Sequence, residues 1–330
     1  MAGTDMPLAR LLEHLDRLAQ KALALWDIPA NASATLINVS ENATYLVKAD
    51  GGFRAILRVH RESYHTRRAI ECELAWINAL DRDKVVVTPG HYRGRDGQAI
   101  QSCTIDGLDA PRFLVLFEFV EGAQPDETGD LTAPFEQLGA MAARMHLHAM
   151  GWPRPDRFER LVWDDAAVFG PRATWGNWRD APNVDGSVRP VLEAAEKAIR
   201  ARLATYGKGR ERYGLIHADA VRENVLVQDG AVALIDFDDC GYGFRLFDLA
   251  TALHPNRTEP AFAEIEAALL EGYRSQRPLP AAAEAALGLF ALLRAFTYVG
   301  WIMARADAPE AEARSRRFID RACALARNWA

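Results

Sequence analysis

The sequence predicts an α+β protein of two lobes, with a small strand-rich N-terminal lobe and a larger helical C-terminal lobe. Short strand-like runs crowd the first third of the chain, whereas helical periodicity dominates after residue 122. The 330 residues are enough for two domains of ordinary size, and 49% of them are hydrophobic. We therefore expect one domain over residues 1–121 and a second over residues 122–330.

The N-terminal lobe opens with an expected amphipathic helix at 8–25, whose apolar residues recur at helical spacing. A second helix is expected at 67–80, among short β-branched or alternating runs that predict strands. These strands are expected at 35–39, 44–47, 54–60, 85–87, 98–105 and 112–119. One helix within a set of antiparallel strands predicts a compact α+β unit.

The C-terminal lobe is expected to be helical at 134–149 and 191–206, with a Pro-, Trp- and Gly-rich irregular segment at 151–190 between them. A strand-rich insert occupies 214–236, and helical patterns follow it to Ala330.

Composition argues against several classes of protein. The net charge of −6 and the 39 basic against 45 acidic side chains show no basic excess of the kind that tracks nucleic-acid phosphates. The longest uninterrupted apolar run, Ala285–Leu293, is about half of the roughly 18 residues that a membrane-spanning helix needs. The four cysteines show no CxxC spacing, which argues against a zinc site or a disulfide framework. We expect a cytoplasmic protein with no nucleic-acid or membrane partner; the sequence indicates no oligomeric state.

The strand-rich insert carries the most informative pattern. Two apolar runs, 225–227 and 231–235, are joined by a turn of three residues containing glycine, which predicts a hairpin. Because a hairpin brings its outer ends together, Asn224 and Asp236 should lie side by side, and Asp219 lies five residues upstream of Asn224. Oxygen ligands of this kind suit Mg²⁺, and a further carboxylate can accept a proton from a hydroxyl nucleophile. The alternative, that these aspartates only cap turns, is disfavoured because the whole pattern matches the catalytic and metal loops of kinases.

At these residues the sequence resembles the aminoglycoside phosphotransferase and choline kinase superfamily, a small-molecule branch of the protein-kinase-like fold, in its homoserine-kinase-like or stress-response-kinase-like form. The resemblance covers about residues 35–301 and implies a bilobal kinase-like fold with a catalytic loop at 217–224 and a metal loop at 236–239. It implies that Asp219 is the catalytic base and that Asn224 and Asp236 hold the metal. It also implies that His217 supports the loop and that Asp248 opens a helix and braces the catalytic loop. Asp248 also fits a plain helix N-cap.

The resemblance extends to the N-terminal lobe, with departures. A loop containing Ser40, Asn42 and Thr44 stands where protein kinases have a glycine-rich phosphate loop. The strand residue expected to contact the α- and β-phosphates is Arg58 in place of the usual lysine; arginine stays charged and can grip phosphate oxygens. The swap keeps open the alternative of an inactive ATP-binding scaffold.

Two more positions complete the expected nucleotide site. Glu73 is the expected acidic partner of Arg58, with Glu71 as its rival and a solvated helix face as the alternative for either. The backbone of Glu118 and Val120 matches the hinge that receives the adenine edge, although an ordinary strand end gives the same pattern.

The sequence supports the candidate residues of the substrate pocket less strongly than those of the catalytic and nucleotide sites. Aromatic and charged residues of the C-terminal lobe can enclose an amine or pair with one, but each aromatic residue taken alone fits core packing better. The candidates are Trp175, Trp178, Asp239, Arg294, Tyr298, Trp301 and Arg305.

The expected function is an ATP- and Mg²⁺-dependent phosphotransferase acting on a hydroxyl of a small, amine-bearing metabolite of the homoserine, amino-alcohol or aminosugar class. A bacterial stress-response protein Ser/Thr kinase is the alternative within the superfamily. A kinase regulated by loop phosphorylation is disfavoured because Ala218 stands where such kinases carry arginine. Only the residues 237–247 separate Asp236 from Asp248, too few for a long activation segment.

Overall fold

The structure, a computed structural model, describes residues 6–125, 129, 131–305 and 311–329. The chain forms two compact units, which we describe separately. The N-terminal unit comprises residues 1–82, 88–121 and 155–159, and the C-terminal unit comprises 83–87, 122–154 and 160–330. The short segments 83–87 and 155–159 thus fall on the other side of the boundary expected at residue 121.

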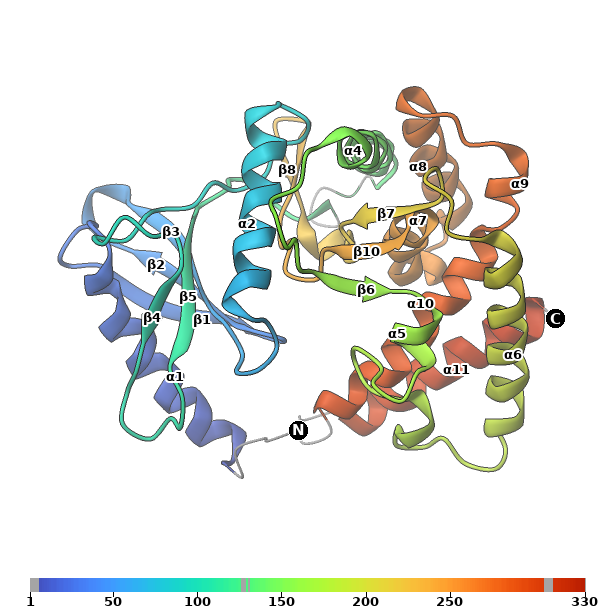
Figure 1. The fold of residues 1–330 in the computed structure, drawn as a ribbon, viewed down its shortest axis with the longest axis horizontal. Coiled ribbons are helices and arrows are strands. Elements are labelled where there is room, and N and C mark those ends of the chain that lie inside the picture. The colour runs from blue at the N-terminus through green and yellow to red at the C-terminus, as the bar shows by residue number, and fades with distance from the viewer. Residues whose placement is uncertain (1–5, 126–128, 130, 306–310, 330) are drawn as a thin grey trace. The chain divides into compact units, whose positions relative to one another are not determined.

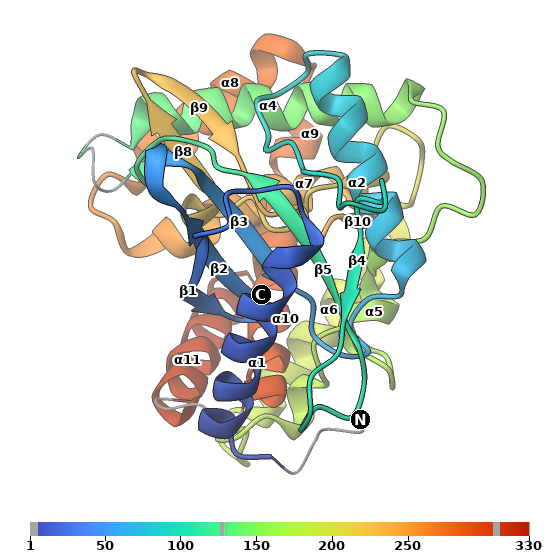
Figure 2. The same ribbon diagram turned by 90° about the vertical axis from the view of Figure 1, so that its left-hand side faces the viewer.

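The N-terminal unit is an antiparallel sheet with the strand order β1-β2-β3-β5-β4, and α1 and α2 lie on opposite faces of it (Figures 1 and 2). Its elements are α1 (Leu8–Ala22), η1 (Leu23–Leu25), β1 (Ser33–Val39), β2 (Ala43–Lys48), η2 (Asp50–Gly52), β3 (Arg54–Val59), α2 (Arg67–Arg82), β4 (Gln101–Cys103) and β5 (Arg112–Glu118). The strand expected at 85–87 is wrong, since those residues form a bend and an extended loop, and the one expected at 98–105 shortens to β4.

Alternation along β3 explains how this sheet serves both helices. Leu57 and Val59 are buried in an apolar core with Leu18 and Ala22 of α1. Arg58, between them in sequence, points to the other face and meets Glu73 of α2. The period of two in the sequence therefore places one charged side chain under α2 while its neighbours fill the core.

The C-terminal unit contains a three-stranded sheet, β6-β10-β7, a separate hairpin of β8 and β9, and a surrounding set of helices (Figure 1). Strand β10 pairs parallel with β6 and antiparallel with β7. The elements are α4 (Thr132–Gly151), β6 (Leu161–Trp163), α5 (Asp165–Phe169), η3 (Trp178–Asp180), α6 (Arg189–Tyr206), β7 (Tyr213–Ile216), η4 (Arg222–Asn224), β8 (Val225–Gln228), β9 (Ala231–Leu234), β10 (Gly241–Phe244), α7 (Arg245–Leu253), η5 (His254–Thr258), α8 (Phe262–Gln276), α9 (Ala281–Glu284), α10 (Leu287–Trp301), η6 (Ile302–Arg305) and α11 (Ala311–Trp329). Strands β6 and β10 lie in stretches for which the sequence predicted irregular or helical structure.

Helices α4 and α8 approach each other closely because each carries a glycine at the contact. A Cβ on Gly139 would lie 1.9 Å from the Leu269 carbonyl oxygen, and one on Gly272 would lie 1.8 Å from the Glu136 carbonyl oxygen. A side chain at either position would therefore force the two helices apart.

The segment Ala281–Trp301 is long and apolar enough to cross a membrane by length and composition, and 61% of its most apolar window is buried inside the protein. The same properties are found in core helices, and α10 has buried residues all round its circumference, from Leu287 to Gly300.

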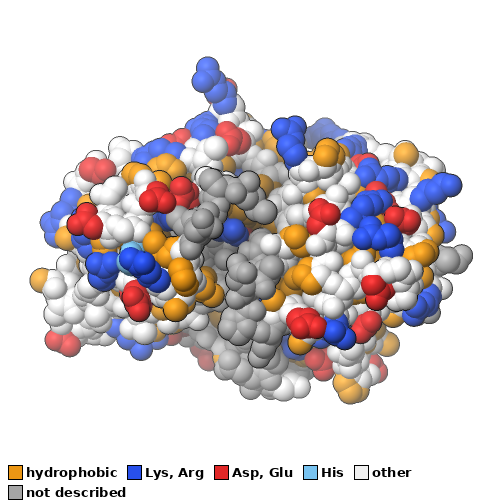
Figure 3. Space-filling view, turned by 90° about the horizontal axis from the view of Figure 1, so that it is seen from below, with side chains coloured by type: hydrophobic (Ala, Val, Ile, Leu, Met, Phe, Trp, Pro, Cys, Tyr) orange, Lys and Arg blue, Asp and Glu red, His pale blue; other side chains and the backbone are white. Residues whose placement is uncertain are grey.

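On the face drawn in Figure 3, basic and acidic side chains are interspersed.

Candidate active site

The predicted catalytic loop connects β7 to β8, and the side chain of Asp248 binds its backbone. The Asp248 carboxylate accepts hydrogen bonds from the backbone N–H groups of His217 (3.0 Å) and Ala218 (2.6 Å). Helix α7 begins at Arg245 with Phe244 as its N-cap, so Asp248 lies within the first turn. The N-cap interpretation is therefore wrong, and bracing of the loop is what the structure shows.

His217 supports the loop through both nitrogens of its ring. Its Nδ1 lies 3.2 Å from the Asp219 backbone nitrogen, which donates to it, and its Nε2 lies 3.2 Å from the carbonyl oxygen of Ile235. The ring also packs edge-on against Phe237, with centroids 4.5 Å apart. The histidine thus ties the catalytic loop to the end of the hairpin.

The Asp219 carboxylate is 23% exposed, and hydrogen bonds reach both of its oxygens. Oδ2 accepts from the side-chain amide of Asn224 at 2.9 Å, and the same amide also donates to the Asp219 carbonyl. Oδ1 lies 2.6 Å from the guanidinium of Arg294. A carboxylate has about four lone-pair positions, so these bonds orient it without using its whole capacity to accept a hydroxyl proton.

The hairpin brings Asn224 and the metal loop together as the sequence predicts. Val225 pairs with Leu234, and the Ile235 backbone N–H donates to the Asn224 carbonyl at 2.9 Å, which places Asp236 directly after this contact. Gln228 pairs with Ala231, so the turn has two residues where three were expected. Asp229 and Gly230 both have positive φ (50° and 79°), the conformation of a type I′ turn.

The side-chain oxygens of Asn224 and Asp236 fit a magnesium ion as ligands. The Asn224 amide nitrogen donates to Asp219, which leaves its oxygen as the group to face a cation, and Asp236 supplies a carboxylate. Among the described residues no group of three or more His, Cys, Asp or Glu side chains forms a metal cluster. Mg²⁺ typically takes only one or two protein carboxylates and completes its octahedron with water and phosphate oxygens, so a small set of ligands is what it requires.

The segment leading into β6 holds the backbone of the metal loop. The guanidinium of Arg160, which is buried, donates to the carbonyls of Cys240 (2.7 Å), Phe237 (3.4 Å) and Asp238. The indole N–H of Trp163 donates to the Asp239 carbonyl at 2.8 Å. Four consecutive carbonyls of the loop therefore accept hydrogen bonds from two side chains of residues 160–163.

A buried network lies behind Asp248. His146 on α4 is completely buried and contacts the Asp248 carboxylate (2.9 Å) and the Tyr273 hydroxyl (3.0 Å), which in turn accepts from Arg277 (2.7 Å). Burial alone would raise the pKa of Asp248, but the hydrogen bonds from His146 and the loop backbone hold that pKa below its ordinary value. Burial lowers the pKa of His146 in spite of its acidic neighbour. His146 is thus a buried packing residue that holds Asp248 in place.

In the N-terminal unit the structure brings together Thr44, Arg58 and Glu73. Arg58 Nη1 lies 2.6 Å from Glu73 Oε1, with the two side chains 9% and 0% exposed, and its guanidinium stands 4.8 Å from the Phe117 ring centroid. Thr44 is the cross-strand partner of Arg58 and therefore shares its face of the sheet. Glu71, the rival partner, pairs with two arginines of its own helix.

The remaining predicted nucleotide residues lie at the ends of strands. Ser40 and Asn42 form the turn between β1 and β2, where the Ser40 N–H donates to the Asn42 carbonyl (2.9 Å) and the Asn42 side chain accepts from the backbone of Arg61 (3.1 Å). Glu118 ends β5 and its backbone N–H donates to the Gly90 carbonyl, while Val120 follows two residues later. Their role in nucleotide binding stays a prediction.

The substrate candidates divide into separate groups. Trp175 and Tyr298 contact the guanidinium of Arg294, at 5.0 and 4.4 Å from their ring centroids. Trp178 lies apart, fully buried against Phe296 with its indole N–H on Glu196 at 2.8 Å.

Three substrate candidates remain: Trp301, Asp239 and Arg305. Trp301 packs edge-on against Phe318, and Asp239 is buried in the metal loop. The side chain of Arg305 lies outside the described residues.

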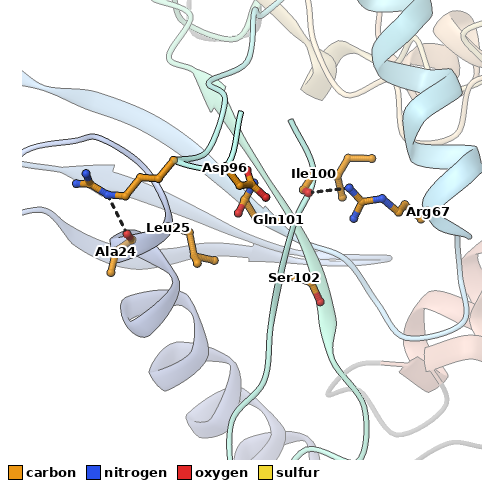
Figure 4. Close-up of a pocket in the computed structure, with 8 residues that line it drawn as sticks. Ala24, Leu25, Arg67, Asp96, Ile100, Gln101 and Ser102 are labelled. Atoms are coloured by element: carbon orange, nitrogen blue, oxygen red, sulfur yellow. Dashed lines mark hydrogen bonds between the residues drawn. The ribbon is translucent and has the colours of Figure 1, made fainter. Parts of the chain in front are cut away.

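A separate hollow of about 400 Å³ lies in the N-terminal unit and contains none of the predicted site residues (Figure 4). Its walls come from the end of η1, the start of α2 and the strand β4 with the loop before it. Arg67 donates to the Ile100 carbonyl (3.2 Å) and Arg95 to the Ala24 carbonyl (3.3 Å), so hydrogen bonds to backbone oxygens hold both arginines at its rim.

Arg160 and Trp163 were not predicted from the sequence, and Arg294 was predicted only as part of the wall of a substrate pocket. No motif surrounds Arg160, and its contacts arise because β6 pairs with β10 about 80 residues further along the chain. A signal for Arg294 was present, since an arginine within the apolar run of α10 must find a partner if it is buried.

Comparisons with known proteins agree with this geometry. The family model described as the phosphotransferase enzyme family matches residues 33–287. A homoserine kinase from Gluconobacter oxydans is 33% identical over an alignment of 291 residues, and the match covers 81% of this chain and 82% of that protein. The structure of a microcompartment-associated aminopropanol kinase superposes with a TM-score of 0.84 at 39% identity, covering 94% of this chain and 96% of the other. An amicoumacin kinase, solved in complex with AMP-PNP, Ca²⁺ and Ami, shares the fold with a TM-score of 0.77 at 21% identity over 97% of this chain and 94% of the other.

Proposed function

Because this chain belongs to the phosphotransferase enzyme family and is a kinase that acts on an alcohol group, we propose that it transfers the γ-phosphoryl group of ATP to a small amino-alcohol of the aminopropanol class. The observation that carries the proposal is the Asp219 carboxylate, which Asn224 orients through one oxygen and Arg294 through the other. The similarity to the aminopropanol kinase, at 39% identity over nearly the whole chain, supports this choice of acceptor.

The proposed reaction is a single displacement at phosphorus. Asp219 accepts the proton of the acceptor hydroxyl while the hydroxyl oxygen forms a bond to the γ-phosphorus. The bond from that phosphorus to the β–γ bridging oxygen breaks, and the electron pair leaves with ADP. The products are ADP and a phosphomonoester of the amino-alcohol. Catalysis of this kind is mainly positioning and electrostatic stabilisation.

In this proposal Asn224 and Asp236 hold Mg²⁺. The ion, when bound, neutralises charge on the nucleotide phosphates. The chain's own contribution is to fix the two oxygen donors through the hairpin and through the loop that Arg160 and Trp163 support.

Arg58 is proposed to bind the α- and β-phosphates. Its guanidinium is held at a fixed place on β3 by Glu73 and by the ring of Phe117. A guanidinium can contact two phosphate oxygens at once, so the replacement of the usual lysine is chemically reasonable.

Homoserine is the second candidate acceptor, because a homoserine kinase is 33% identical over 81% of this chain. Homoserine carries a carboxylate beside its amine, whereas an aminopropanol carries only the amine. The two acceptors therefore differ by one negative charge, and a direct comparison of their kcat/KM values separates them.

The test is Mg²⁺-dependent ADP release from ATP with single acceptors: 1-amino-2-propanol, ethanolamine, homoserine, an aminoglycoside and a mixed peptide. We expect the amino-alcohols to give the highest kcat/KM, and Asp219→Asn to abolish release while ATP still shifts the thermal transition. Asp229→Asn is the matched control, because it changes a carboxylate to an amide on the nearby hairpin turn, where asparagine tolerates positive φ. Homoserine as the preferred acceptor would replace the amino-alcohol assignment. Release with the peptide alone would identify a protein kinase, and ATP binding without release in any arm would identify a scaffold.

A further inference from the structure

Arg294 is a charged side chain in the middle of the most apolar helix of the C-terminal unit. It has no exposed surface, and three aromatic rings surround its guanidinium. The centroids of Tyr298, Trp175 and Phe247 lie 4.4, 5.0 and 5.7 Å from its central carbon. A buried guanidinium needs charged or polar partners because its desolvation is costly, so its hydrogen bonds show what holds it there.

Those hydrogen bonds lead to the catalytic loop. Nη2 lies 2.6 Å from Asp219 Oδ1 and also donates to the Tyr298 hydroxyl at 3.0 Å. Nη1 donates to the backbone carbonyl of Ala218 at 3.3 Å. Arg294 therefore contacts two consecutive residues of the loop, one through its carboxylate and one through its backbone.

The backbone contact falls at a strained residue. Ala218 has φ of +68°, in the left-handed region that residues with a Cβ rarely adopt. Its N–H donates to Asp248 and its carbonyl accepts from Arg294, so the peptide groups on both sides of the strained Cα are held by buried charged groups. The direction of the Asp219 side chain depends on this conformation, because Asp219 is the next residue.

The catalytic loop contains an arginine, Arg222, but its guanidinium bonds to residues outside the loop. The Arg222 guanidinium bonds to Glu259 at 3.0 Å and to Asn256 at 3.4 Å. The positive charge beside the Asp219 carboxylate is instead supplied by α10, about 75 residues further along the chain.

We propose that Arg294 is a positioning residue for the catalytic base: it fixes the Asp219 carboxylate through Oδ1 and the loop backbone through Ala218. The carboxylate is then presented to the acceptor hydroxyl in one orientation. The same contacts place the guanidinium of Arg294 against the rings of Trp175 and Tyr298. These rings therefore hold the residue that positions the base, and they do not enclose a substrate amine. This inference rests on the proposed function, since it takes Asp219 as the base.

The experiment compares Arg294→Met, Arg294→Lys and Arg294→Ala with Arg179→Met and Arg179→Ala. Arg179 is a matched control in the same unit: its guanidinium lies 4.5 Å from the Trp178 ring centroid and 2.7 Å from a Glu196 carboxylate oxygen. We expect Arg294→Met to lower kcat about 10²-fold, as misplacement of a reacting group does, while the KM for ATP stays close to that of the wild type. Arg294→Lys should recover part of this loss, because an ammonium can contact Asp219 but lacks the second nitrogen that Arg294 uses for the Ala218 carbonyl.

Chemical rescue separates positioning from loss of structure. Arg294→Ala removes the guanidinium from a ring-lined site, so added guanidinium ion should raise its kcat several-fold and leave the kcat of Arg179→Ala unchanged. Each variant is first shown to be folded by the shift of its thermal transition on addition of ATP; if Arg294→Met fails this check, Arg294→Lys carries the comparison.

Wild-type kcat in a folded Arg294 variant would overturn the proposal, as would equal losses in the Arg294 and Arg179 variants without rescue. The outcome for Asp219→Asn distinguishes this from a failure of the proposed function. If Asp219→Asn is inactive and the Arg294 variants are fully active, only the positioning role is wrong. If Asp219→Asn retains full activity, the assignment of the base is wrong.

Discussion

The buried pair of Arg58 and Glu73 allows stability and catalysis to be measured separately at one site. Replacing Glu73 with alanine leaves the Arg58 side chain, which is only 9% exposed, without the carboxylate that lies 2.6 Å from its guanidinium. Breaking a buried pair by removing one partner costs about 3–5 kcal/mol, because the other charge stays desolvated. We expect Glu73→Ala to lower the free energy of unfolding by an amount in this range, measured by urea denaturation.

The double variant Arg58→Met/Glu73→Leu should behave differently. Replacing both members of a buried pair with apolar groups of similar volume is often neutral or stabilising, since no charge is left in the core. The double variant should therefore regain most of the stability that Glu73→Ala loses. It should nevertheless bind ATP weakly and turn over slowly, because the proposed phosphate ligand is gone.

The control is Glu121→Ala, which breaks the ion pair between Glu121 and Arg54, a residue on the same strand as Arg58. These side chains are 41% and 47% exposed, so the loss should be below about 1 kcal/mol. If Glu73→Ala costs as little as this control, the pair is not the buried unit that the structure shows. If the double variant recovers both stability and full activity, Arg58 does not bind the nucleotide.

Three further predictions follow from the C-terminal unit. Gly139→Ala should lower the free energy of unfolding by about 1–3 kcal/mol, because the new Cβ would lie 1.9 Å from the Leu269 carbonyl; Gly151→Ala, with open space around it, should show no such loss in the same thermal melts. Burial, together with neighbouring arginines, holds the pKa of His254 well below its ordinary value, so the folded state keeps it neutral while the unfolded chain binds a proton below about pH 6.5. The free energy of unfolding should therefore fall as the pH drops from 7.5 to about 5.5, and a His254→Gln variant with an equally steep slope in urea denaturation would contradict this. Arg160→Met should raise the Mg²⁺ concentration for half-maximal ADP release about tenfold, as loss of a supporting contact does at a metal site; an unchanged Mg²⁺ titration would show that the metal loop keeps its shape without that contact.

The sequence allowed the local features of this protein to be predicted. The hairpin of β8 and β9 follows from two apolar runs around an Asp-Gly turn, and it brings Asn224 next to the residue that precedes Asp236. The four helices expected with stated bounds, which correspond to α1, α2, α4 and α6, end within a few residues of those bounds, because their apolar spacing is regular. The pairing of Arg58 with Glu73 was predicted from the resemblance to a family, and the alternation of side chains along β3, which turns Arg58 toward α2, explains it.

What the sequence did not predict depends on contacts between distant segments. Strands β6 and β10 have only three and four residues, so neither shows a recognisable run, and they pair with each other although about 80 residues separate them in the chain. The strand expected at 85–87 does not form for a related reason: within the described part of the chain its backbone shares one hydrogen bond with the backbone of another segment, from the Leu234 N–H to the Val87 carbonyl. Short strands are specified by their neighbours more than by their own residues.

The catalytic and metal loops likewise combine a local sequence motif, which can be predicted, with supporting contacts from distant segments, which cannot. Ala218 and Asp236 both have positive φ, +68° and +61°, and such conformations persist only where the surroundings impose them. The sequence motif supplies these residues but not the groups that hold them, which are Asp248 and Arg294 for the catalytic loop and Arg160 for the metal loop. All three supporting side chains are buried and come from other elements, so the geometry of the short motif depends on the packing of the whole unit. A substitution that loosens α7, α10 or the segment before β6 should therefore act on turnover through the loops, even though it touches neither ATP nor the acceptor.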